Sequence, residues 1–383
     1  MSFYIDLTEF LVNPITTGIQ RITGEICRYS PPGMAFPVRL SSQGFVALSP
    51  ALIDAIGSYF GSATPAAAEE IRRLGGVQNG STIEMSPDDT VLVPEVFDDP
   101  QRVSFFRQMS DRELQRYRFV VYDLLPVTHP EYFIPENLLR IYDYFRTLRR
   151  ATHCGFISED TRDVYYGRLK RTSYRGGVVL PLGCDALGSR VSTPELNRSL
   201  TFSVLGTVEP RKNHKLILEA FEPLLREYRT LKLSFLGKMG WIDSDFAQRV
   251  QTLASDPTSG FEFHSVQSDN AIRSYVEQSR ATIYVSTAEG YGLPPVESLW
   301  LGTPVIASTT IPSLKRLGSA GIHYVNPVTA SSLRSTVLTF LDDAYANRKT
   351  QETAQLTLPT WRSFTEEVLR WCAPVPTTHE LLH

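Results

Sequence analysis

Two glutamates, Glu289 and Glu297, flank a glycine-containing turn at residues 290–292. The apolar run 281–285 before the turn predicts a buried strand, and residues 295–301 after it predict the first turns of a helix. Glycines allow a sharp turn and leave backbone N–H groups near the positive end of a helix, where phosphate binds. Because carboxylates accept hydrogen bonds from hydroxyls, the segment suits a nucleotide sugar, whose phosphates lie between two hydroxyl-bearing rings. The alternative is a surface loop with two solvated glutamates.

A second chemical segment contains two adjacent cations, Arg211 and Lys212. It follows a predicted strand at 200–205 and precedes a predicted helix at 216–228, so both cations are expected at the carboxyl edge of a sheet. Two fixed cations there could bind a diphosphate and stabilise it as it leaves. A solvated turn is the alternative, because Arg and Lys beside proline are common on surfaces.

Residues 206–213 and 289–297 together resemble the donor site of the family-4 retaining glycosyltransferases. The second segment matches the Glu-x7-Glu signature of that family, and the likeness extends over nearly the whole chain. The resemblance implies an α/β fold with GT-B architecture, in which two Rossmann-like parallel-sheet domains face one another across a cleft.

The resemblance also implies roles for single residues. Glu297 would bind the ribose hydroxyls, Glu289 the hydroxyls of the donor sugar, and the cations the diphosphate. Many family members have Gly-Arg in the first segment, whereas here Gly206 precedes Thr207, so the assignment of Lys212 is firmer than that of Arg211. The expected donor-binding residues are Gly18, Thr207, Arg211, Lys212, Val266, Glu289, Gly290, Tyr291, Gly292, Leu293 and Glu297.

The first half of the chain offers further polar residues after predicted strands. Gly18, in a Thr-Gly-Ile-Gln-Arg run that similar bacterial sugar transferases also contain, could let a diphosphate or an acceptor approach the backbone. Asp123 could orient or deprotonate an acceptor hydroxyl, and His129 suits proton exchange near neutral pH, although a lone loop histidine is more often structural. Both side chains are expected at the rim of the cleft, and Glu95, after the predicted strand at 91–93, is a weaker candidate for the same rim. The expected catalytic residues are Glu289, Arg211, Lys212, Asp123 and His129.

Alternating apolar and helical runs predict two βα series, which indicates two parallel sheets covered by helices. The predicted elements include helices at 18–29 and 103–114 and a strand at 231–236. A polar stretch near residue 188 separates the series. We therefore expect an acceptor-binding domain at 1–187, a donor-binding domain at 188–360, and a final helix at 361–383 that packs back toward the first domain. Residues 58–89 fit this alternation poorly and are interpreted as a helix and loop insertion.

Composition sets limits on the partners. The 383 residues carry a formal net charge of −3, which argues against general nucleic-acid binding, and no apolar run approaches membrane-spanning length. The four scattered cysteines indicate reduced thiols in a cytoplasmic protein. Residues 138–175 have an excess of basic side chains that could attract an anionic membrane surface or a diphospholipid acceptor, although a solvated helical face explains most of them.

The expected function is transfer of a hexose from a nucleotide sugar to a hydroxyl of a glycan or lipid-linked oligosaccharide in bacterial polysaccharide assembly. The residues of the motifs resemble those of bacterial mannosyltransferases, and this resemblance favours GDP-mannose as the donor. The sequence contains no obvious hydrolase-like carboxylate pair and no Asp-x-Asp motif at the candidate sites, so the resemblance implies front-face attack with retention and without metal or other cofactor. The alternatives are a UDP-sugar-dependent transferase, a phosphorylase-like or epimerase enzyme, and a non-catalytic sugar-nucleotide-binding assembly protein.

Overall fold

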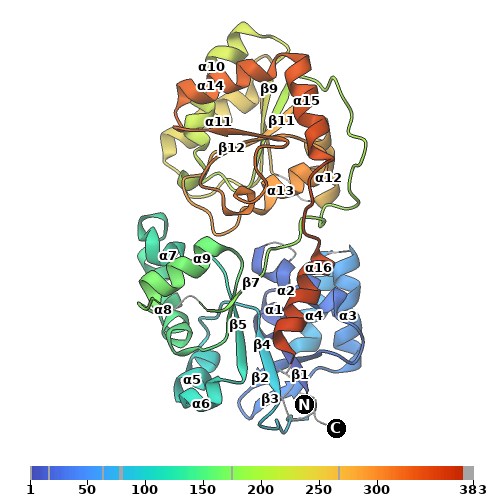
Figure 1. The fold of residues 1–383 in the computed structure, drawn as a ribbon, viewed down its shortest axis with the longest axis vertical. Coiled ribbons are helices and arrows are strands. Elements are labelled where there is room, and N and C mark those ends of the chain that lie inside the picture. Colours follow the sequence, from blue (N-terminus) through green and yellow to red (C-terminus); the bar gives the residue numbers. More distant parts are fainter. Residues whose placement is uncertain are drawn as a thin grey trace. The chain divides into compact units, whose positions relative to one another are not determined.

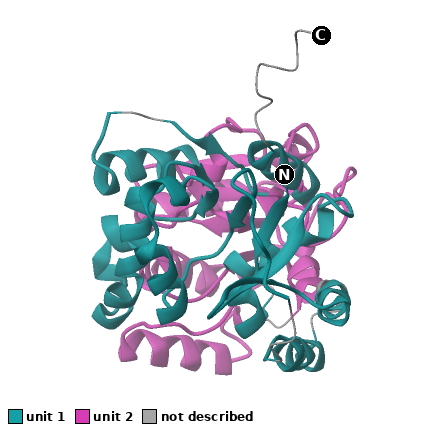
Figure 2. Ribbon diagram, turned by 90° about the horizontal axis from the view of Figure 1, so that it is seen from below, with its two compact units in different colours: residues 1–182, 361–383 teal, residues 183–360 magenta. Residues whose placement is uncertain are grey.

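The structure is a computed structural model, and it describes residues 2–15, 18–62, 64–76, 81–173, 176–265 and 268–373. The chain forms two compact units, which we call unit 1 (residues 1–182 and 361–383) and unit 2 (residues 183–360) (Figure 2). The sequence placed this boundary slightly later, after residue 187. Residues 184–188 go with unit 2 because the backbone N–H of Cys184 donates to the Pro359 carbonyl at 3.0 Å and the Trp300 indole donates to the Gly188 carbonyl at 2.8 Å.

Unit 1 contains a sheet of seven strands in its described residues, in the order β3-β2-β1-β4-β5-β6-β7 (Figure 1). Neighbouring strands are parallel except for the antiparallel pair β2 and β3. The strands are β1 Phe3–Asp6, β2 Phe36–Ser41, β3 Gly44–Ala47, β4 Thr90–Val93, β5 Tyr117–Val121, β6 Cys154–Phe156 and β7 Val178–Val179. The helices are α1 Thr8–Val12, α2 Gly18–Tyr29, α3 Pro50–Ser62, α4 Pro65–Gly76, α5 Pro100–Gln108, α6 Asp111–Leu114, α7 Leu125–Thr128, η1 Pro130–Tyr132, α8 Pro135–Arg150, α9 Glu159–Val164, the π-helix η2 Tyr165–Leu169 and α16 Trp361–Cys372.

The final helix, α16, completes unit 1 although it is remote from the rest of that unit in the sequence. Its apolar residues Phe364 and Val368 are buried, and the helix packs along α2. The hydroxyl of Thr365 donates to the backbone carbonyl of Glu25 on α2 at 3.3 Å. An amphipathic helix with one apolar stripe has to bury that stripe, and α2 supplies the surface.

Unit 2 contains a sheet whose described strands are all parallel, in the order β10-β9-β8-β11-β12-β13. The strands are β8 Thr201–Leu205, β9 Lys232–Leu236, β10 Phe261–His264, β11 Ala281–Tyr284, β12 Val305–Ser308 and β13 Ile322–Val325. The helical segments are η3 Pro210–Lys212, α10 His214–Glu227, α11 Ser244–Ser255, α12 Asp269–Gln278, α13 Leu293–Trp300, η4 Pro312–Leu314, α14 Ala330–Phe340 and α15 Asp343–Thr353. Two α/β units, each with helices around a mainly parallel sheet, agree with the predicted fold class.

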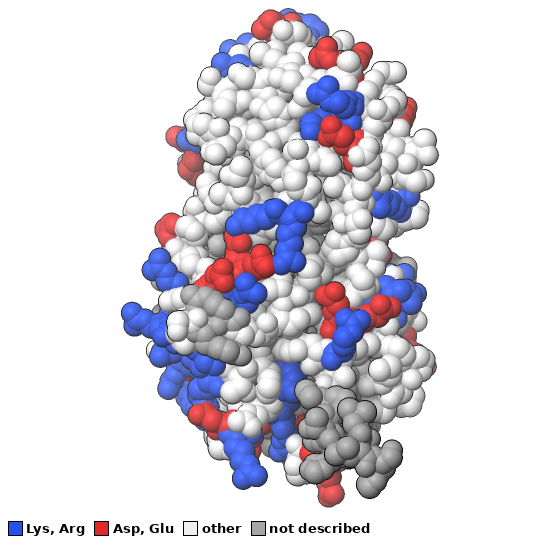
Figure 3. All heavy atoms as spheres, viewed as in Figure 1, with Lys and Arg blue, Asp and Glu red and all other residues white. Residues whose placement is uncertain are grey.

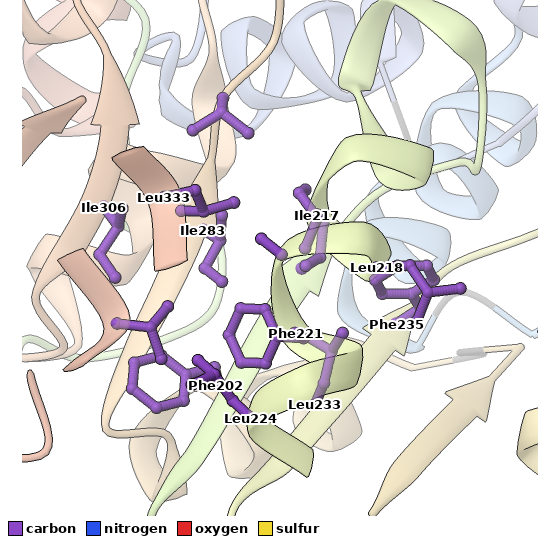
Figure 4. Close-up of a cluster of buried hydrophobic side chains, with 14 of the residues drawn as sticks. Phe202, Ile217, Leu218, Phe221, Leu224, Leu233, Phe235, Ile283, Ile306 and Leu333 are labelled. Carbon is purple, nitrogen blue, oxygen red and sulfur yellow. The ribbon is translucent and has the colours of Figure 1, made fainter. Parts of the chain in front are cut away.

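A hydrophobic core of unit 2 lies between the sheet and helices α10, α11 and α14. Figure 4 shows Ile217 and Phe221 of α10 pointing toward the strand residues Phe202 and Ile283. The rings of Phe202 and Phe221 meet edge to face at 5.5 Å between centroids. On the opposite sheet face, Thr282 shares a hydrogen bond of 2.7 Å with Ser298 of α13. Because both faces are covered, the strands are rigid supports for the loops at their ends.

The described part of the chain contains no helix that is both long and apolar enough to cross a membrane.

Candidate functional site

The predicted donor motifs follow two strands that are neighbours in the sheet of unit 2. Strands β8 and β11 pair directly. The strand that follows β8 in the sequence, β9, lies on one side of this pair, and the strand that follows β11, β12, lies on the other. Such a point of divergence is where open parallel sheets bind ligands, beyond the carboxyl ends of the strands. The loop after β8 is residues 206–213, and the loop after β11 is residues 285–292. The sheet therefore brings the two predicted motifs together.

The Glu289 carboxylate lies between the two predicted cations. Its Oε2 is 2.6 Å from Arg211 Nη1, and its Oε1 is 3.1 Å from Lys212 Nζ. Burial by itself raises the pKa of the Glu289 carboxyl, but Lys212 and Arg211 together lower that pKa below its ordinary value. Glu289 is therefore ionised at neutral pH, as an acceptor of sugar hydroxyls should be.

Tyr284, the last residue of β11, organises the same site. Its hydroxyl donates to the Leu205 carbonyl at 3.1 Å, and Lys212 Nζ lies 5.5 Å from the ring centroid. Burial, followed by the charges of Glu289 and Glu297, raises the pKa of Tyr284 well above its ordinary value. Both carboxylates of the Glu-x7-Glu segment thus lie near this ring. Glu297 is on α13 and is only 7% exposed.

The turn at residues 290–292 has the conformation that its glycines suggest. Gly292 has a φ of +90°, and a Cβ added there would lie 2.7 Å from Ile311 Cγ2. Ser313 fixes the turn, because its N–H donates to the Tyr291 carbonyl at 2.9 Å and its hydroxyl donates to the Gly292 carbonyl at 2.6 Å. Helix α13 then begins at Leu293, two residues earlier than predicted, and its N-terminus follows the turn directly.

Sequence reasoning missed Gly237 and gave no role to Asn213, the last residue of the first motif. A Cβ on Gly237, just after β9, would lie 2.2 Å from the Gly206 carbonyl oxygen, so only glycine allows the two loops to approach. Asn213 has a left-handed φ of +58°, and its side-chain amide donates to the Val285 carbonyl at 2.7 Å. The Gly-x-x-Gly spacing of Gly237 and Gly240 after a predicted strand was the available signal for the first contact.

Two other predicted donor-site residues are less informative. Thr207 is exposed in the loop after β8. Val266, predicted near the nucleobase, lies outside the described residues. In the described ranges, no group of three or more His, Cys, Asp or Glu side chains could hold a metal ion, and metal independence stays a prediction.

The predicted residues of the first half all belong to unit 1. Gly18 begins α2 with a φ of +58° and open space around its Cβ position. Asp123 and His129 lie at opposite ends of α7: Asp123 is exposed and caps the Leu125 N–H at 3.2 Å, whereas His129 pairs with Glu131 at 3.0 Å. His129 also stacks on Tyr132, with 5.3 Å between ring centroids. These contacts give His129 a local structural role and leave its catalytic role a prediction.

The expectation of Glu95 at a rim is wrong, because this side chain is buried and only 1% exposed. Its Oε2 accepts from the Phe10 N–H of α1 at 3.1 Å, while its Oε1 has no hydrogen-bond partner among the described residues. Burial raises the pKa of Glu95 to about 8, and the charge of Asp6 adds to the increase, against the opposing effect of Arg102. A short helix needs acceptors for its first N–H groups, and Glu95 supplies one from inside the unit.

We predict that Glu95→Gln makes unit 1 more stable relative to wild type as the pH rises. The folded-state pKa lies above the unfolded value, so the wild type loses up to about 1.4 kcal/mol of stability per pH unit between the two values. Glutamine stays neutral and can still accept from Phe10. Thermal unfolding from pH 5 to pH 8.5 should show the difference in Tm growing. The exposed Glu136→Gln is the control, and a constant difference for Glu95→Gln would show that this carboxyl is ionised in the folded state throughout.

Comparison with known proteins shows which proteins this chain is similar to. The family model "Glycosyl transferases group 1" matches residues 189–357. The serotype-specific mannosyltransferase WbdA of Escherichia coli is 26% identical over 272 residues, covering 66% of this chain and 33% of WbdA. The O-antigen chain mannosyltransferase RfbU of Salmonella typhimurium is 23% identical over 226 residues, covering 58% of this chain and 60% of RfbU. The chain thus spans about a third of the length of the curated relatives it matches first.

The fold comparison extends over both units. The crystal structure of Anabaena HepE aligns with a TM-score of 0.60 and 13% identity, covering 97% of this chain and 98% of HepE. The family match covers the whole of the β8–β13 sheet and includes the site around Glu289. Residues 189–357 therefore match the glycosyl transferases group 1 model, and the chain as a whole has an α/β fold similar to that of HepE, a GT-B structure.

Proposed function

We propose that this chain transfers a hexose from a nucleotide sugar to a hydroxyl of a glycan or lipid-linked oligosaccharide in bacterial polysaccharide assembly. The observation that carries the proposal is the contact between Lys212 and Glu289 where β8 and β11 diverge. A cation and a carboxylate joined there offer one group for a diphosphate and one for sugar hydroxyls. The related proteins WbdA and RfbU are mannosyltransferases, so GDP-mannose is our first choice of donor.

The proposed chemistry assigns separate tasks to the residues. Glu289 accepts hydrogen bonds from hydroxyls of the donor sugar, and Glu297 accepts from the ribose. Lys212 neutralises charge that develops on the diphosphate as its bond to the anomeric carbon breaks, which stabilises the transition state. The acceptor hydroxyl attacks the same face of the sugar, and the leaving diphosphate takes its proton. The anomeric configuration is therefore retained, and Lys212 supplies the charge stabilisation for which other enzymes use a metal.

The test is turnover of GDP-mannose and UDP-glucose by the purified protein. We expect release of GDP that depends on an added mannan or lipid-linked glycan acceptor and persists in EDTA, with the product linkage assigned by NMR. If nucleoside diphosphate is released from UDP-glucose and not from GDP-mannose, the donor is a UDP-sugar and the assignment of GDP-mannose is wrong. Binding of nucleotide sugar without release, across a panel of acceptors, would favour the non-catalytic assembly protein.

We also propose that helix α8 contacts an anionic membrane on which the acceptor is held. The α8 surface consists of Leu139, Tyr142, Arg146 and Arg149, and its two apolar side chains are 78% and 60% exposed. Figure 3 shows Lys and Arg side chains gathered over the part of unit 1 that contains α8. Asp143 offsets part of this charge, since it pairs with Arg107 at 2.7 Å and Arg146 at 3.6 Å. Apolar side chains among arginines suit the interface of an anionic bilayer.

We predict that the double variant Arg146→Ala, Arg149→Ala binds phosphatidylglycerol vesicles about tenfold or more weakly, because each basic residue near such a surface contributes roughly 1 kcal/mol. Vesicle co-sedimentation at low and high salt measures this affinity. Leu338→Ser, an exposed leucine of α14, is the control for loss of apolar surface elsewhere. Equal binding of wild type to neutral phosphatidylcholine vesicles would contradict the electrostatic contact.

A further inference from the structure

Arg211 lies between two carboxylates of unit 2. Its Nη2 is 2.7 Å from Glu209 Oε1, and its Nη1 is 2.6 Å from Glu289 Oε2. Nη1 also donates to the Ala288 carbonyl at 3.2 Å. All three charged side chains are mostly buried, with exposures of 20% for Arg211, 15% for Glu209 and 10% for Glu289. The planar guanidinium has donors in fixed directions and can therefore hold two carboxylates in one geometry.

The backbone of Arg211 joins the same two loops. Its carbonyl accepts from the Thr287 N–H at 2.8 Å and from the Thr287 hydroxyl at 3.1 Å. The two loops are thus joined through the Arg211 backbone, and the Arg211 side chain adds a second connection between them. A group that connects two loops at several points is suited to fixing the orientation of the carboxylate between them.

Lys212 has a different set of contacts. Its ammonium group contacts Glu289 Oε1 at 3.1 Å, and it otherwise faces the Tyr284 ring and lies near Gly206. An ammonium group has three donors, so this contact leaves capacity for a ligand. Around Arg211, by contrast, Glu209 places a second negative charge, which disfavours an incoming diphosphate at that position. The two adjacent cations therefore differ in how suitable they are for binding an anion.

We propose that Arg211, held by Glu209, is a positioning residue that orients the Glu289 carboxylate toward the donor sugar, and that Lys212 is the cation that binds the diphosphate. This inference rests on the proposed function and assigns a role to Glu209, which the sequence motifs did not single out. It also replaces the expectation that both cations bind the diphosphate. A carboxylate recognises hydroxyls by direction. Loss of the contacts that Arg211 makes with Glu209 and Glu289 should therefore affect the sugar-dependent step and the choice between sugar epimers.

The test separates nucleotide binding from sugar transfer. Affinity for GDP and for UDP, which lack the sugar, is measured by calorimetry, and kcat and KM are measured with GDP-mannose and GDP-glucose. We expect Arg211→Ala and Arg211→Lys to bind the nucleoside diphosphate within about threefold of wild type but to lose on the order of 10² in kcat. Arg211→Lys is decisive, because lysine keeps the charge but cannot hold two carboxylates in a planar fork.

Variants of Glu209 provide an independent test of the same proposal. Glu209→Gln keeps an oxygen that can accept from Arg211 and should retain more turnover than Glu209→Ala, whereas both should bind GDP or UDP as wild type does. Each variant is compared by thermal unfolding, and the exposed Lys215→Ala is the matched control on α10. The inference is overturned if Arg211→Ala weakens nucleoside diphosphate binding as much as Lys212→Ala does, or if Arg211→Lys has wild-type turnover and sugar preference. If the wild type binds neither GDP nor UDP, the proposed function itself fails.

Discussion

Lys212→Ala is expected to reduce nucleotide-sugar turnover by about 10² to 10³-fold, the usual cost of removing one group aimed at developing transition-state charge. Its Nζ is held 3.1 Å from Glu289 and against the Tyr284 ring, so the group is already in place before a donor binds. Such fixed placement needs no reorganisation during the reaction, and this is why its loss should affect kcat and nucleotide affinity together.

The measurement is acceptor-dependent release of nucleoside diphosphate. The affinity of each variant for the released nucleoside diphosphate is determined separately. Lys215→Ala removes an identical charge from an exposed position on α10 and should have wild-type activity. Lys212→Ala also leaves Glu289 with one cation instead of two, so the pKa of Glu289 should rise toward its ordinary value. A variant with undiminished turnover would place the diphosphate elsewhere in the protein.

The second large effect is expected from Gly237→Ala, which should destabilise unit 2 and also impair the donor site. An added Cβ would lie 2.2 Å from the Gly206 carbonyl oxygen and 2.5 Å from its carbonyl carbon. Backbone atoms cannot rotate away as a flexible side chain can, so the loop after β8 has to move. Overpacking of this kind costs about 1–3 kcal/mol or more, and a domain of this size loses roughly 2–4 °C in Tm per kcal/mol.

Thermal unfolding and GDP binding measure the two parts of this expectation. Gly57→Ala is the control, since Gly57 is inside α3 with nothing within 4 Å of its Cβ position. That change should be neutral or stabilise by about 0.5–1 kcal/mol, because alanine is the better helix former. If Gly237→Ala unfolds at the wild-type temperature and binds GDP normally, the close approach of the two loops is not needed for the site.

Much of the fold could be predicted because local patterns encode it. The helix predicted at 18–29 is α2 with the same bounds, and the strand predicted at 281–285 is β11 to within one residue. Predictions were less complete elsewhere. Strands β2, β3 and β13 were not anticipated, and the helix predicted at 103–114 is interrupted between α5 and α6. Ser110 explains the interruption, because it caps α6 with a complete capping box.

The site was predictable to a similar degree. Glycines, carboxylates and cations after strands identified the two loops, because turn chemistry and strand ends leave a local signature. The burial of Glu95 was not predictable, since its surroundings include Phe10 and the charged Asp6, which are distant in the sequence. The pairing of Arg211 with Glu209 was equally hidden, because adjacency in the sequence does not determine the direction in which a long side chain points.

The sequence by itself determined the α/β pattern, the two motifs and the resemblance to sugar transferases, because each depends on residues close together along the chain. Only the tertiary structure decided that β8 and β11 are neighbours, and this adjacency brings Glu289 within hydrogen-bond distance of Lys212, which is 77 positions earlier. The tertiary structure also decided that Glu209 forms an ion pair with Arg211, whereas Lys212 keeps N–H groups that can donate to a ligand. The physical reason is that strand order and side-chain packing arise from burial across the whole unit, whereas charge interactions are decided over a few ångströms.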